Sequence, residues 1–263
     1  PAPTRPLQSP AACVSSALPM RRRECNPRSL KLLGLILTCS ITCFYTLRPL
    51  FKSHVTNLEM VFAGSRYGGW WYNEALVSQG SIVYSFGLGE DTSFDEYLLK
   101  KGIDVYGFDP TPKSRRYVTG RRELFGNVGK FHYTAEGLSV EETFLEFTLP
   151  ENPAHVSMRQ GVHDGMGDVV VLKVDTLKKF MSRNGHEHID VLKLDIESSE
   201  YDVLEEMIES QHFPFVQLLV EFHQRFDGIG EERHRKILDG LRRSGFIVLH
   251  QDDSQDEISF QKI

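Results

Sequence analysis

The end of the chain is the feature that most constrains the fold. Two short segments, Phe246–His250 and Glu257–Gln261, are predicted as β-strands, and only Gln251–Asp256 joins them. A parallel crossover needs about a dozen residues or more, so these strands are expected to form an antiparallel hairpin. Strands and helices alternate before this point, which predicts a mostly parallel sheet with helices on both faces.

Five earlier segments complete the predicted seven-stranded α/β sheet. They are Ile82–Phe86, Ile103–Phe108, Lys130–Tyr133, Ile189–Leu194 and Val216–Val220. Amphipathic helices are predicted after the first strand, capped by Thr92 or Ser93, and around Leu177–Arg183, Tyr201–Ile208 and Ile237–Leu241. Two further strand-like segments, Thr143–Leu149 and Val169–Val174, are interpreted as a hairpin-like insertion around a glycine-rich loop.

A glycine turn follows the first strand of this sheet, where Gly87 and Gly89 precede Glu90 and Asp91. Glycine lets the backbone approach a ligand closely, and the helix that follows directs free N–H groups toward it. Asp109 ends the second strand, where a carboxylate can accept hydrogen bonds from ribose hydroxyls. An ordinary tight turn is the simpler interpretation of the two glycines. Thr92 replaces the third glycine of the dinucleotide fingerprint, which argues against a nicotinamide cofactor.

Charge is unevenly distributed along the 263 residues. The whole chain carries a net charge of −6. Residues 1–52 contain a single acidic residue, Glu24, and many basic ones: Arg5, Arg21, Arg22, Arg23, Arg28, Lys31, Arg48 and Lys52. The remainder is therefore acidic and lacks the positive field that nucleic acid requires, so we expect no nucleic-acid partner. All four cysteines precede residue 53, which leaves the later residues without disulfides or thiolate chemistry.

An uncharged, mostly apolar stretch, Leu32–Leu47, lies within the basic region. We predict a signal-anchor or transmembrane segment at 30–50, a disordered basic tail at 1–29, and a linker or flap at 51–80 before a domain at 81–263. The basic residues before the stretch would keep the N-terminus cytosolic. This predicts a single-pass type II membrane protein of the secretory pathway, with its domain on the non-cytosolic side. The alternatives are secretion after signal cleavage and a buried helix.

Several motifs resemble those of the FkbM-type methyltransferases, especially the animal methyltransferase-like proteins. They are VYSFGLGEDTSFDEYL (83–98), YGFDPTP (106–112), HYTAEGLS (132–139), VLKLDIESSEYDVL (191–204) and QLLVEFH (217–223). The resemblance implies a Rossmann-like class I methyltransferase fold and S-adenosylmethionine as cofactor. Many FkbM-type proteins have glycine where this chain has Ser198.

The resemblance also implies roles for individual residues. Gly87 and Gly89 would hold the methionine end of the cofactor, Asp109 the ribose, and Ala135, Glu136 and Gly137 would lie near the adenine. Asp195 would face the methyl group. The predicted cofactor-binding residues are Gly87, Gly89, Glu90, Asp91, Asp109, Pro110, Glu136, Gly137 and Asp195.

The predicted catalytic residues follow the fourth and fifth strands: Asp195, Glu197, Glu221 and His223. Methyl transfer needs an aligned acceptor and often a base, and His223 is the natural near-neutral base. His223 could equally hold a loop by hydrogen bonding, and Lys193 could neutralise neighbouring carboxylates. The four residues could also bind a divalent metal, but no tight ligand motif is present and none is predicted.

These observations predict an S-adenosylmethionine-dependent methyltransferase, with O-methylation of a small-molecule or glycan acceptor implied by the resemblance. A non-catalytic module that keeps the fold and binds the cofactor is the alternative. A nicotinamide-dependent oxidoreductase is a further alternative, against which Thr92 and the terminal hairpin argue.

Overall fold

A computed structural model of the chain describes residues 58–121, 130–148, 159–160, 168–225 and 229–263. All of them belong to one compact unit, His54–Ile263. The predicted tail and signal-anchor segment lie outside the described residues. Within the part that is described, no helix is long and apolar enough to cross a membrane.

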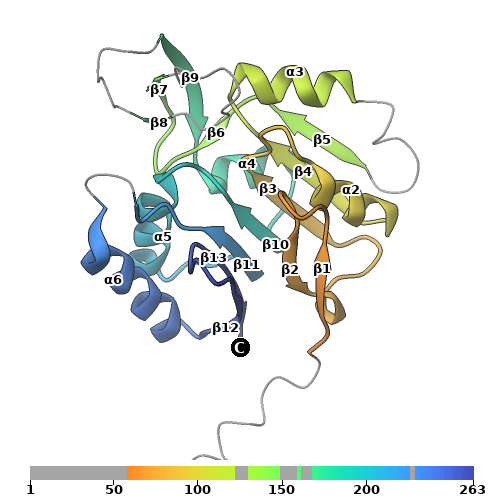
Figure 1. The fold of residues 1–263 in the computed structure, drawn as a ribbon, viewed down its shortest axis with the longest axis vertical. Helices are drawn as coiled ribbons and strands as arrows, with labels where there is room; N and C mark the ends of the chain where they lie inside the picture. The colour runs from red at the N-terminus through yellow and green to blue at the C-terminus, as the bar shows by residue number, and fades with distance from the viewer. Residues whose placement is uncertain (1–57, 122–129, 149–158, 161–167, 226–228) are drawn as a thin grey trace, which may run out of the picture. The chain divides into compact units, whose positions relative to one another are not determined.

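The central sheet has seven strands in the order β12-β13-β11-β10-β3-β4-β5 (Figure 1). They are β3 (Ile82–Phe86), β4 (Asp104–Phe108), β5 (Phe131–Thr134), β10 (Ile189–Leu194), β11 (Phe215–Glu221), β12 (Phe246–Gln251) and β13 (Glu257–Lys262). The pairs β3–β4, β4–β5, β3–β10 and β10–β11 are parallel, whereas β13 runs antiparallel to both β11 and β12. The predicted parallel sheet with a terminal hairpin is confirmed.

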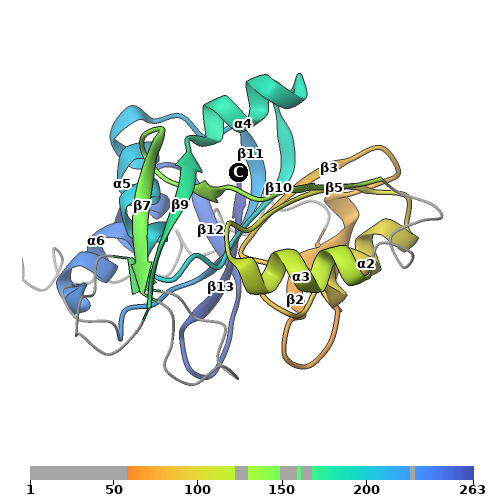
Figure 2. The ribbon, with the colours of Figure 1, turned by 90° about the horizontal axis from the view of Figure 1, so that it is seen from above.

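Helices cover both faces of this sheet, as the alternating pattern predicted (Figures 1 and 2). They are α2 (Ser93–Lys100), α3 (Pro112–Gly120), α4 (Leu177–Asn184), α5 (Ser199–Ser210) and α6 (Gly230–Arg243). One buried cluster joins α4, α5 and α6 to the sheet through Phe180, Leu204 and Ile237, among others. A second cluster on the opposite face joins α2 and α3 through Leu98 and Val118.

Thr92 is the residue before α2, but its side chain makes no capping hydrogen bond. The Oδ1 atom of Asp91 accepts one from the Ser93 backbone N–H instead, at 2.8 Å. Thr92 therefore occupies the N-cap position, as predicted, but the side-chain hydrogen bond is made by Asp91, one residue earlier. A carboxylate serves well in this place because it faces the positive end of the helix dipole.

The insertion between β5 and α4 forms its own four-stranded sheet, in the order β6-β9-β7-β8. Its strands are β6 (Gly137–Leu138), β7 (Thr143–Thr148), β8 (Arg159–Gln160) and β9 (Val169–Asp175). Strands β7 and β9 pair antiparallel, which confirms the predicted hairpin-like arrangement. Strand β6 brings Gly137 and Leu138 to the edge of the central sheet's ligand side, where both line a pocket.

The segment before β3 contains an antiparallel hairpin of β1 (Met60–Ala63) and β2 (Trp70–Asn73), followed by the short helix η1 (Glu74–Leu76). Buried hydrogen bonds connect it to the central sheet. The Asn73 N–H donates to Gln217 Oε1 at 2.7 Å, the Gln217 side chain donates back to the Asn73 carbonyl at 3.1 Å, and Asn73 Nδ2 donates to Gln261 Oε1 at 3.0 Å. The hairpin thus packs on the sheet, and its own residue Trp70, at the start of β2, is buried.

Candidate active site

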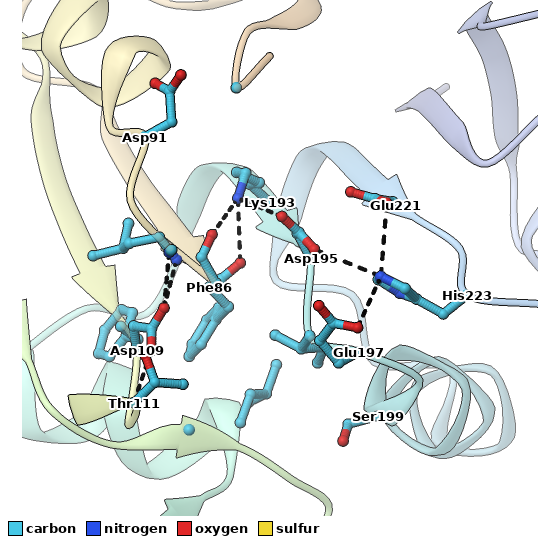
Figure 3. Close-up of a pocket in the computed structure, with 18 of the residues that line it drawn as sticks. Phe86, Asp91, Asp109, Thr111, Lys193, Asp195, Glu197, Ser199, Glu221 and His223 are labelled. Atoms are coloured by element: carbon cyan, nitrogen blue, oxygen red, sulfur yellow. Dashed lines mark hydrogen bonds and ion pairs between the residues drawn. The ribbon is translucent and has the colours of Figure 1, made fainter. Parts of the chain in front are cut away.

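A pocket of about 550 Å³ opens at the carboxyl ends of β3, β4, β10 and β11 (Figure 3). Parallel strands of a doubly wound sheet present their loops at this edge, which is where such folds bind ligands. The glycine turn and Asp109 lie on one side of the pocket. Asp195, Glu221 and His223 lie on the other. The pocket therefore brings together the two groups of residues that the sequence analysis assigned to cofactor and acceptor.

The glycine turn is shaped by β10 as well as by any ligand. Gly87 and Gly89 both have positive φ angles, of 79° and 53°. A Cβ on Gly87 would lie 1.7 Å from the backbone carbonyl oxygen of Asp195. Lys193, which is buried, donates from Nζ to the Gly87 carbonyl at 2.6 Å. Glycine at 87 is thus required by the close approach of β3 and β10, and Lys193 fixes the turn rather than merely neutralising carboxylates.

The Asp109 carboxylate is hydrogen-bonded to the same turn. Its Oδ2 accepts hydrogen bonds from the backbone N–H groups of Leu88 and Gly89, both at 3.0 Å, and its Oδ1 accepts from Thr111 N–H at 2.8 Å. Burial raises the pKa of Asp109, although these bonds oppose the shift. The carboxylate lines the pocket, but ribose hydroxyls would have to share it with the backbone. A bond from Asp109 to ribose stays a prediction.

Glu90 and Asp91 also line the pocket, and both have protein partners. Glu90 forms an ion pair with Lys113 at 2.8 Å. Asp91 Oδ2 accepts a hydrogen bond from Ser65 Oγ at 2.6 Å, which connects the β1–β2 loop to the turn before α2. Burial alone would raise the pKa of Asp91, but hydrogen bonds from Ser65 and Ser93 lower it. Asp91 therefore positions the hairpin loop, whose residues Arg66 and Tyr67 reach the pocket.

Only some of the residues predicted to lie near the adenine line the pocket. Pro110 and Gly137 line it, and a Cβ on Gly137 would meet Pro110 and Val174, both at 3.1 Å. Glu136 does not line it. Its carboxylate forms ion pairs with Arg183 at 2.7 Å and with Lys173 at 3.4 Å, so its role as a cofactor-binding residue has no support from the geometry.

On the opposite side, three carboxylates surround the Nε2 atom of His223 (Figure 3). Glu197 Oε2 lies 3.5 Å from Nε2, Glu221 Oε1 lies 3.7 Å away and Asp195 Oδ1 lies 3.9 Å away. All four residues line the pocket, and His223 is only 1% exposed. The structure thus brings together all the residues predicted as catalytic. We refer to Asp195, Glu197, Glu221 and His223 as the acceptor-side cluster.

A fourth carboxylate, which sequence reasoning missed, completes the surroundings of His223. Glu200 in the first turn of α5 accepts hydrogen bonds on Oε1 from the backbone N–H of His223 at 2.9 Å and from its Nδ1 at 3.1 Å. Burial alone would lower the pKa of His223, but Glu200, with Glu197 and Asp195, raises it to about 9. The surrounding carboxylates therefore favour the imidazolium form of His223 over the neutral base expected from its residue type.

Glu257 is a second residue that sequence reasoning missed. It lines the pocket from β13, directly opposite Glu221 in the antiparallel pair. Burial, together with the nearby charge of Glu221, raises the pKa of Glu257 to about 7. Burial and Asp195 raise the pKa of Glu221 as well. The predicted hairpin could have indicated Glu257, because its register with β11 decides which residue faces Glu221.

Backbone strain marks the turn between β10 and α5. Glu197 and Ser198 both have positive φ angles, of 53° and 86°, although neither is glycine. Such conformations cost roughly 1–2 kcal/mol per residue and concentrate at functional sites. The turn projects Glu197 toward His223 and begins the helix that carries Glu200.

One set of ligand atoms lies close enough together for a metal ion. Oxygens of Asp195 and Glu221 and a nitrogen of His223 all lie within 4.8 Å of one another. Exposed acidic groups are common without an ion, so this proximity alone does not establish a metal site. We assign no metal to these residues.

Residues 82–248 match the methyltransferase FkbM domain. The chain belongs to this family. The resemblance that the sequence motifs carried is thereby confirmed, and the family supports S-adenosylmethionine as the cofactor.

Two curated relatives are similar over part of their length. The human protein named "Probable methyltransferase-like protein 24" is 28% identical over 148 residues, which cover 56% of this chain and 33% of the relative. The rat protein of the same name is 26% identical over 192 residues, covering 68% of this chain and 46% of the relative. The chain thus spans less than half the length of these relatives.

Solved structures with a similar arrangement include an rRNA methylase from Streptococcus thermophilus. It has a TM-score of 0.41 and 11% identity, covering 72% of this chain and 90% of the other. Fibrillarin from Aeropyrum pernix, determined with natively bound S-adenosyl-L-methionine, has a TM-score of 0.38 and 12% identity, covering 72% of this chain and 68% of the other.

Proposed function

We propose that this chain is an active S-adenosylmethionine-dependent methyltransferase that O-methylates a small-molecule or glycan acceptor. The observation that carries the proposal is that one pocket is lined by both the glycine turn and the acceptor-side cluster. Methyl transfer from a sulfonium is an in-line displacement, so donor and acceptor must occupy one cavity together. A volume of about 550 Å³ lies in the range of pockets that hold small molecules and cofactors.

The residues on the turn side fit S-adenosylmethionine. Glycine at 87 and 89 allows the backbone to approach a ligand closely, and the N-terminus of α2 presents a positive dipole to a carboxylate. Pro110, Gly137 and Leu138 supply an apolar wall for a flat ring. When bound, the cofactor supplies an electrophilic methyl group. Asp195 belongs to the acceptor-side cluster and lies 3.7 Å from Lys193, which is hydrogen-bonded to the glycine turn, so it is suited to orient the acceptor beside the cofactor.

The residues on the other side fit an acceptor that carries hydroxyl groups. Carboxylate oxygens accept hydrogen bonds, so Glu197, Glu221 and Glu257 favour an acceptor that carries groups able to donate them. Glu257 is suited to take the proton of the reacting hydroxyl, since a base is most effective when its pKa lies near the working pH. The His223 imidazolium would then balance the charge of the surrounding carboxylates.

The test is methyl transfer by the full chain. The protein is incubated with methyl-labelled S-adenosylmethionine and pools of small polyols, phenols and oligosaccharides, and labelled products are identified by mass spectrometry. We expect a labelled methyl ether, whose formation falls at least a hundredfold in Asp195→Asn but not in Asp202→Asn. Asp202 is an exposed carboxylate on α5. Cofactor binding without transfer to any pool would favour the non-catalytic module.

A further inference from the structure

Glu200 is a fully buried carboxylate that does not line the pocket. It is 0% exposed, and it lies in the first turn of α5, just after the turn that contains Glu197. Its Oε1 accepts two hydrogen bonds, both from His223. Its Oε2 is also buried and has no hydrogen-bond partner in the part of the chain that the structure describes. A buried carboxylate with one oxygen unsatisfied is costly unless a positive charge lies beside it.

The hydrogen bond to Nδ1 fixes the direction of the His223 ring. Because Glu200 accepts at Nδ1, that nitrogen carries a hydrogen, and Nε2 is left to face Glu197, Glu221 and Asp195. Carboxylates therefore lie at both nitrogens of one imidazole. Such an environment stabilises the doubly protonated, cationic ring.

We propose that Glu200 is a positioning residue that keeps His223 protonated, and that the His223 imidazolium holds Asp195, Glu197 and Glu221 together as the acceptor-binding surface. This inference rests on the proposed function for its consequence in methyl transfer. The pairing of Glu200 with His223 stands on the geometry alone.

The charges around His223 come from four elements and the turns beside them. The carboxylates are Asp195 after β10, Glu197 in the β10–α5 turn, Glu200 on α5, Glu221 on β11 and Glu257 on β13. The cations nearby are Lys193 on β10 and Arg225 after β11, which lie 3.7 Å from Asp195 and 3.6 Å from Glu221. Five carboxylates against two other cations would repel one another if His223 were neutral. The protonation state of His223 therefore decides whether these carboxylates can remain close together.

A purely structural role for Glu200 is the rival explanation. Its bond to the backbone N–H of His223 could simply connect α5 to the end of β11. Glu200→Gln separates the two roles, because the amide keeps the size and an acceptor oxygen but removes the negative charge. Glu206→Gln is the matched control, since it makes the same change at an exposed position of the same helix.

The experiment is an NMR titration of the full chain labelled with ¹⁵N-histidine, with His223→Gln to assign the signal and with EDTA present throughout. In the wild type we expect both nitrogens of His223 to be protonated at pH 7. In Glu200→Gln we expect the titration midpoint of His223 to fall by about 1–3 units, whereas Glu206→Gln leaves it unchanged. A neutral His223 in the wild type at pH 7 overturns the proposal even if Glu200→Gln fails to fold. An unchanged midpoint in folded Glu200→Gln overturns it as well.

A second readout separates this inference from the proposed function. S-adenosylmethionine binding by Glu200→Gln should stay within threefold of the wild type, while its rate of methyl transfer falls at least tenfold at pH 7. If the midpoint of His223 falls as expected but the wild type transfers no methyl group, the proposed function fails and the pairing stands. If the midpoint falls and transfer is unaffected, the positioning role is overturned.

Discussion

The backbone carbonyl oxygen of Asp195 occupies the space where a side chain on Gly87 would begin. A Cβ at position 87 would lie 1.7 Å from that oxygen, and the φ angle of Gly87 is 79°. The end of β3 therefore packs directly against the end of β10, which leads into Asp195 and Glu197. No side chain can be added at this point without separating β3 from β10.

We expect Gly87→Ala to destabilise the protein by about 3 kcal/mol or more, since the clash is with backbone and the conformation is left-handed. The affinity for the cofactor should fall as well. Thermal unfolding monitored by circular dichroism measures the first effect. Gly120→Ala in α3 is the control, because its added Cβ meets no atom within 4 Å. Equal melting temperatures for the two variants would contradict the packing described here.

Asp109→Ala should lower the stability of the ligand-free protein by about 2–4 kcal/mol, because it leaves the N–H groups of Leu88, Gly89 and Thr111 without their acceptor. Denaturant unfolding without cofactor checks this. Asp104→Ala, at the other end of β4, removes one backbone-to-carboxylate bond and should cost less. If Asp109→Ala weakened cofactor binding without any loss of stability, the main role of Asp109 would be to bind ribose and not to hold the turn.

The strands of the central sheet could be predicted because they are buried on both faces. Ile82–Phe86 and Ile189–Leu194 coincide with β3 and β10, since each is a short apolar run bounded by turn signals. The terminal hairpin followed from the length of Gln251–Asp256 alone. The cluster of Asp195, Glu197, Glu221 and His223 could be predicted because adjacent parallel strands bring their carboxyl ends together.

The parts that sequence could not predict depend on tertiary packing. Glu200 is simply one more acid on an amphipathic helix until His223 is placed beside it. The hydrogen bonds from the glycine turn to Asp109 depend on the distance between β3 and β4. The partnership of Glu136 with Arg183 depends on how the insertion packs on α4. For Asp109 and Glu136, residue type indicated a cofactor ligand, whereas a protein partner already used the charge.

Ser198→Gly should stabilise the protein by about 1 kcal/mol, because Ser198 has a φ of 86° and glycine adopts that region without strain. The change also restores the glycine that many FkbM-type proteins have there. Ser210→Gly, a helical position at the end of α5, should instead cost up to about 1 kcal/mol. Urea unfolding of both variants measures the difference, and a destabilised Ser198→Gly would show that the serine side chain has a role.

The pKa of His223, raised to about 9, predicts a specific loss of stability in alkali. Protonation of the folded state is favoured over the unfolded state, so the contribution is complete below about pH 6.5 and is lost as pH rises to about 9. Its size is about 3 kcal/mol. We therefore expect the free energy of unfolding of the wild type to fall over this interval relative to His223→Gln. A constant difference between the two proteins from pH 6 to 9.5 would contradict the assignment.

Glu257→Gln should reduce methyl transfer by about a hundredfold or more, as expected for loss of a general base, and leave cofactor binding unchanged. In the wild type, the rate at limiting acceptor should rise with pH around a midpoint near 7, because Glu257 must lose its proton first. Asp253→Asn, an exposed position in the same hairpin, is the control. A rate that is independent of pH between 6 and 8 would exclude Glu257 as the proton acceptor.

Isothermal titration of S-adenosylmethionine into the full chain, with NAD as the competing ligand class, tests the central claim most directly. The account predicts saturable binding of S-adenosylmethionine, no binding of NAD, and at least tenfold weaker binding in Gly87→Ala than in Gly120→Ala. A folded wild type that bound NAD, or that bound neither ligand, would contradict the assignment of this pocket to a methyl donor.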